Sequence, residues 1–89
     1  MRIKEGFVLR SIAGRHIVIG EGIAQVDFKK MVSMNDSAAF LWKSVEGKDF
    51  TVEDLASLLT GEYEISAEEA ASHAAYVASK WIDAGLVSE

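Results

Sequence analysis

Residues 31–42 decide the fold, and they read Met31-Val32-Ser33-Met34-Asn35-Asp36-Ser37-Ala38-Ala39-Phe40-Leu41-Trp42. The first four residues are apolar apart from one serine, as in a short β-strand. Asn35 is a favoured helix N-cap, and Asp36 adds negative charge to the first turn, where the helix dipole stabilises it. Apolar residues then recur at the helical spacing i, i+3, i+4, i+7, at Ala38, Leu41, Trp42 and Val45. A strand therefore leads directly into an amphipathic helix, which ends at Gly47.

The residues before this stretch predict antiparallel strands. Residues 7–12 and 16–19 are rich in β-branched and aromatic side chains, and residues 13–15 between them favour a tight hairpin. Residues 24–28 alternate small or apolar side chains with polar ones, which is typical of a half-exposed strand. Residues 31–34 form either a separate strand or the end of one longer, bent strand.

Two more helices follow the first. One begins at Thr51, which together with Asp54 comes close to a capping box, and ends at Gly61. The next begins at Ser66, the first residue of the Ser-x-x-Glu pattern of a full capping box, and runs to about Ala84. Both helices are predicted from a polar cap at one end and a glycine at or just beyond the other.

Together these elements predict one α+β domain over residues 1–89, in which three or four antiparallel strands precede a bundle of three helices. The chain has 89 residues, which is enough for one modest core. It has no cysteine, and no apolar run approaches the roughly 18 residues that a membrane span needs. Residues 1–6 lack the apolar segment of a signal peptide. We therefore expect a cytoplasmic protein that does not bind membranes.

Charge is divided unevenly along the chain. Residues 1–34 carry six Lys/Arg and three Asp/Glu, a net charge of +3, whereas residues 35–89 carry three and eleven, a net charge of −8. Opposite charges on the two halves suggest two faces with different partners, although surface helices also use glutamate simply for solubility.

The third helix has an unusually wide apolar surface. At about 100° per residue, its apolar side chains cover roughly 200°, whereas packing against one neighbour requires only about 100°. One flank consists of Ala70, His73, Val77, Trp81 and Ala84, and the other of Ala67, Ala71, Ala75, Ala78 and Ile82. We expect this helix to pack against two neighbours, so that either both flanks belong to the core or one of them is available to a bound peptide.

The sequence contains little that could support catalysis. His16 and His73 are the only histidines, and neither has a second metal ligand at i+3 or i+4. Motifs for a nucleophilic serine, a phosphate-binding loop or a zinc hydrolase do not occur. We therefore predict no catalytic residue, no metal site and no cofactor. Glu68, Glu69 and Asp83 outweigh Lys80 on the third helix, which opposes nucleic-acid binding by that helix.

Residues 31–42 resemble the pattern of the PqqD family, in which an apolar strand and Leu-Asn precede two polar residues, a small pair and an apolar helix. Residues 46–47, 51–55 and 84–87 and the region of Tyr63 are similar to later parts of that family, so the resemblance covers residues 7–87. It implies a winged-helix-like domain known as a RiPP recognition element. Such a domain binds the leader of a ribosomally synthesised precursor peptide as an extra strand and presents it to a modifying enzyme, in the founding pathway a radical SAM enzyme.

The resemblance also implies where the peptide binds, namely between the last strand and the third helix. The edge strand would be formed by Met31, Val32, Ser33 and Met34, and the helix wall by His73, Val77 and Trp81. Residues 20–30 depart from the shorter family pattern, so the strand that contains Val26 and Phe28 is an alternative edge. The pyrroloquinoline quinone pathway is one possible setting, and the cognate peptide stays open.

Two other functions remain as alternatives. The domain could be a scaffold or dimerisation module, including a homodimer, that meets a partner enzyme through its acidic helices. It could also be a winged-helix nucleic-acid binder, which the charge of the third helix disfavours.

Overall fold

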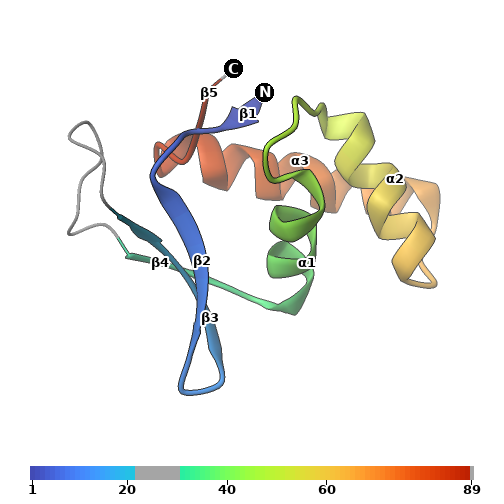
Figure 1. Ribbon diagram of the computed structural model, residues 1–89. Helices are drawn as coiled ribbons and strands as arrows, with labels where there is room; N and C mark the ends of the chain where they lie inside the picture. The colour runs from blue at the N-terminus through green and yellow to red at the C-terminus, as the bar shows by residue number, and fades with distance from the viewer. Residues whose placement is uncertain (22–30, 89) are drawn as a thin grey trace.

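The computed structural model describes residues 1–21 and 31–88, and it has the predicted α+β class (Figure 1). Its strands are β1 (Arg2–Ile3), β2 (Phe7–Ile12), β3 (Arg15–Gly20), β4 (Met31–Met34) and β5 (Val87–Ser88). Its helices are α1 (Asp36–Val45), α2 (Val52–Glu62) and α3 (Ala67–Asp83). Strands thus precede the three helices, as predicted, apart from the two-residue β5 at the end.

An antiparallel sheet with the order β2-β3-β4 forms one side of the domain. The hairpin between β2 and β3 turns at Ala13 and Gly14, whose φ angles of 52° and 78° suit a two-residue hairpin turn. β3 lies in the centre, and β4 pairs with it so that Val32 is opposite Val18. Within the described residues β4 pairs with no other strand, so it forms an edge of the sheet. The strand expected at 24–28 lies outside the described residues.

A second sheet, of two strands, joins the two ends of the chain beside the helices. β1 pairs antiparallel with β5, and the N–H of Lys4 donates to the carbonyl of Leu86 at 2.9 Å. The backbone of Met1 exchanges two hydrogen bonds with Phe50, at 2.6 and 2.8 Å. These strands are not predicted from the sequence, because a two-residue strand is too short to show an alternating pattern.

The first two helices begin at the predicted caps. The Asn35 side chain accepts a hydrogen bond from the Ala38 N–H at 2.9 Å. Thr51 and Asp54 form a complete capping box, in which each side chain accepts from the other residue's N–H, at 3.1 and 3.0 Å. The start of α1 is also joined to β3, since His16 Nε2 lies 2.9 Å from a carboxylate oxygen of Asp36.

Two details of the later helices differ from the prediction. α2 does not end at Gly61 but continues to Glu62, because the N–H of Tyr63 still donates to the Leu59 carbonyl at 2.9 Å. At the start of α3 the Ser66 hydroxyl accepts from the Glu69 N–H at 3.1 Å. The Glu69 carboxylate accepts from that hydroxyl, at 3.3 Å, so the N-cap of α3 is a single cap rather than a full box.

The capping box at Thr51 provides a first test of how these helices are stabilised. We expect Thr51→Ala to lower the free energy of unfolding by about 1 kcal/mol, because it removes the oxygen that caps the first turn of α2. Thr60→Ala is the matched control, since Thr60 lies in the last turn of α2 and is exposed. Urea unfolding measures both. An equal loss in the two variants would contradict the role of the cap.

The core lies between the helices and one face of the sheet. Its largest fully buried side chains are Trp42, Leu41, Leu55, Leu59, Leu86 and Val18. The rings of Trp42 and Trp81 meet edge to face with their centroids 5.3 Å apart, and Phe50 packs on Trp81 in the same way at 6.1 Å. α3 and α2 pack along each other, which places α3 across the centre of this core (Figure 1).

The two flanks of α3 have different environments. On the first, Ala70, Val77 and Trp81 are buried. On the second, Ala78 is buried, whereas Ala67, Ala71 and Ala75 are exposed and Ile82 is 36% exposed. The alternative in which both flanks belong to the core is therefore wrong for most of the second flank, because α2 and the sheet leave it uncovered.

Candidate functional site

A hollow of about 340 Å³ lies between the edge strand β4 and helix α3. Val32, Ser33, Met34 and Asn35 form its strand side, with Ala38 beside them at the start of α1. His73, Tyr76, Val77, Lys80, Trp81 and Ala84 form its helix side. The structure thus brings together most of the residues that the family resemblance implied, from two segments about 40 positions apart in the sequence.

Within the described residues, the strand side combines an apolar face with an unpaired backbone edge. Val32 and Met34 face the interior, where Met34 is buried and Val32 half-buried, whereas Ser33 is exposed. In an antiparallel pair, every other residue directs its N–H and C=O away from the partner strand. β4 pairs only with β3 in the described part of the chain, so its outer backbone groups border the hollow.

The helix side combines an apolar floor with a polar rim. Val77 and Trp81 are 5% and 2% exposed and form the floor. His73 is half-buried, and its Nε2 lies 3.2 Å from the Ser37 hydroxyl. At the rim, the ammonium group of Lys80 lies 5.4 Å from the centroid of the Tyr76 ring, within cation–π range. No carboxylate is among the described residues that line the hollow, so Lys80 gives the rim a positive charge.

One of the implied edge residues is not part of this arrangement. Met31 begins β4 and is 63% exposed, but it does not line the hollow. Val26 and Phe28 lie outside the described residues.

Conversely, the hollow includes Tyr76 and Lys80, which helical spacing assigns to the polar face of α3. Both lie within one turn of Val77 or Trp81, and this spacing was the available signal.

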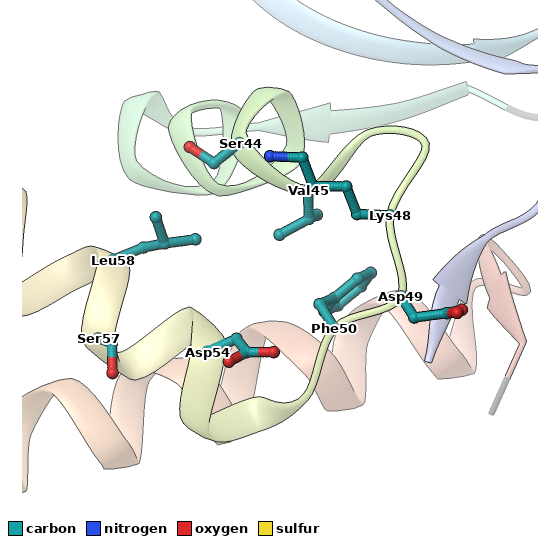
Figure 2. A pocket seen from close by; sticks show the side chains of 8 residues that line it. All are labelled: Ser44, Val45, Lys48, Asp49, Phe50, Asp54, Ser57 and Leu58. Atoms are coloured by element: carbon teal, nitrogen blue, oxygen red, sulfur yellow. The ribbon is translucent and has the colours of Figure 1, made fainter.

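Another hollow, of about 360 Å³, lies between the end of α1 and the first half of α2 (Figure 2). The side chains of Val45, Phe50 and Leu58 face it, and Lys48 and Asp54 are among its polar lining residues. It contains none of the implied site residues. Within residues 1–21 and 31–88, no group of three or more histidine, aspartate or glutamate side chains is arranged to hold a metal ion.

The described residues therefore define a small α+β domain in which an edge strand of the sheet borders an apolar hollow with a basic rim. The sequence model of the family "Coenzyme PQQ synthesis protein D (PqqD)" matches residues 7–87, and the chain belongs to this family. The match has the same span as the resemblance found in the sequence. No curated protein and no solved structure matches the chain. None of the helices in the described residues is long and apolar enough to cross a membrane.

Proposed function

We propose that this protein is a non-enzymatic adaptor, which binds the leader of a ribosomally synthesised precursor peptide as an added strand on β4 and presents it to a modifying enzyme. The observation that carries the proposal is the position of β4, which is an edge strand among the described residues and borders the hollow below α3. Membership of the PqqD family supports a role in coenzyme synthesis of the PQQ type.

Strand addition would use both walls of the hollow. A peptide that pairs with β4 gains backbone hydrogen bonds, and its alternate side chains point toward the apolar floor at Val77 and Trp81. Lys80 at the rim favours a peptide that carries a carboxylate there. The net charge of +3 on residues 1–34 would attract such an acidic leader from a distance.

A titration of the isotope-labelled full chain tests this function. The probes are synthetic peptides that correspond to the short reading frames encoded beside its gene. We expect one of them to shift amide resonances of residues 31–34 and 73–84. Shifts confined to residues 24–28 would move the edge to that strand, and the absence of shifts in all three segments with every peptide would contradict the proposal.

Backbone methylation of a binding peptide tests strand addition without altering the protein. An added strand directs every other N–H toward β4. Methylating two such nitrogens should weaken binding about thirtyfold, since each lost hydrogen bond costs about 1 kcal/mol. Methylating the two intervening nitrogens is the matched control and should leave the affinity nearly unchanged. Fluorescence anisotropy measures the affinity, and equal losses from both sets would exclude pairing with a strand.

A further inference from the structure

His73 separates two hollows on the surface of α3 rather than bordering only one. The second hollow, of about 310 Å³, is lined by Ser37, Leu59, Tyr63, Ile65, Glu69 and His73. The two hollows adjoin at His73, which lines both and whose Nε2 lies 3.2 Å from the Ser37 hydroxyl, and together they are called the groove. The second hollow therefore lies beyond the end of β4, toward the start of α3.

The end of β4 lies close to this second hollow, since Ser37, three residues after Met34, lines it. The chain of β4 itself turns away after Met34, because Asn35 caps α1 (Figure 1). An added strand has no such turn, so it can continue past Met34 toward Ser37 and His73, which both line the second hollow. Its next residues then reach the second hollow.

We infer that the second hollow is a subsite for the same peptide, and that it binds a second apolar side chain four residues from the one in the first hollow. This inference rests on the proposed function. On α3, the residues that line the first hollow lie on average about eight positions after those that line the second. This separation corresponds to about 12 Å along a helix. An extended chain covers that distance in about four residues. An even spacing also places both side chains on the same face of the added strand.

The lining of the second hollow suits an apolar side chain. Leu59 is 1% exposed and forms its floor, with Ile65 half-buried beside it. Tyr63 forms one wall, and its ring is held edge to face against Phe40 with the centroids 6.0 Å apart. Tyr63 nevertheless remains 37% exposed, which leaves part of its ring available to a ligand.

Charge along the groove favours one arrangement of the peptide. Lys80 lines the first hollow and Glu69 lines the second. A peptide with an acidic residue near its first anchor and a basic residue near its second matches this pattern. The residue midway between the anchors faces His73 and Ser37, so a polar side chain is favoured there.

Selection from a display library of random 16-residue peptides against the immobilised full chain tests the subsite. We expect enriched peptides to carry apolar residues at i and i+4, with an acidic residue close to the anchor that binds beside Lys80. Enriched peptides with a single apolar anchor, or with no fixed spacing, would overturn the subsite and leave the proposed function standing. If no peptide were enriched, both would be overturned.

A variant at Tyr63 then locates the second anchor. For an enriched peptide, replacing the second apolar residue by alanine should weaken binding about tenfold, as expected for partial burial of one such side chain. In Tyr63→Ala this tenfold difference between the two peptides should disappear, while the affinity for the single-anchor peptide stays the same. Ile12→Ala, at an exposed site on the β2–β3 hairpin, is the control and should keep the difference. A difference that persists in a folded Tyr63→Ala protein would overturn the subsite.

Discussion

Replacing Trp42 by alanine is expected to lower the free energy of unfolding by about 3–5 kcal/mol, as for other large aromatic residues in protein cores. Trp42 is fully buried, and its ring packs edge to face on Trp81, which in turn contacts Phe50. Small domains are stable by only about 5–15 kcal/mol, so much of the total would be lost. Far-ultraviolet circular dichroism during urea unfolding measures the change without relying on the deleted fluorophore.

Trp42→Phe is the matched control for this prediction. Trp42 Nε1 is buried and has no hydrogen-bond partner within the described residues. An unpaired buried N–H costs about 1–3 kcal/mol, and phenylalanine removes that cost while keeping a ring against Trp81. We therefore expect Trp42→Phe to cost less than about 1.5 kcal/mol. If both variants lost the same stability, the packing of a ring on Trp81 would not be the main contribution of Trp42 to the free energy of unfolding.

The same aromatic cluster connects stability with the proposed site. Trp81 belongs to the core through Trp42 and to the floor of the groove through its place beside Val77. A substitution at Trp81 would therefore alter folding and peptide binding together. Tyr63 and Lys80 are better positions for testing binding alone, because both are exposed at the rim of the groove.

Local signals explain why much of the fold could be predicted from the sequence. Asn35 and Thr51 cap helices through contacts within three residues, so their pattern is complete in the sequence. Gly61 was misinterpreted because a glycine ends a helix only where the backbone becomes left-handed, and this one continues the helix. Ala67 and Ala75 of α3 remain exposed because the coverage of a flank depends on distant segments, which helical spacing does not reveal.

The groove, too, could be predicted from the sequence only in part. The family resemblance implied the strand and helix that face each other, and Val32 and Val77 line one hollow as expected from it. Helical spacing alone assigned Lys80 to the solvent face, because it contains no information on where the sheet edge lies. The second hollow is formed by Leu59, Ile65 and other residues of α1, α2, α3 and the segment between α2 and α3, so no single sequence motif predicts it.

Leu86→Ala is expected to lower the free energy of unfolding by about 2–5 kcal/mol, the usual range for a buried leucine. Leu86 is fully buried directly before β5, and its backbone joins two distant parts of the chain. Its N–H donates to the Trp81 carbonyl and its carbonyl accepts from the Lys4 N–H, both at 2.9 Å. Loss of its side chain should loosen the pairing of β1 with β5 as well as open a cavity.

Leu58→Ala is the matched control, because it makes the same chemical change at a half-buried position beside the hollow of Figure 2. We expect it to cost only about 1 kcal/mol, since much less apolar surface returns to water. Hydrogen exchange at the Lys4 amide separates the two effects of Leu86→Ala, because that amide is protected only while β1 and β5 remain joined to α3. Unchanged protection of Lys4 in Leu86→Ala would mean that the sheet of the chain ends is held by its backbone alone, independently of the core.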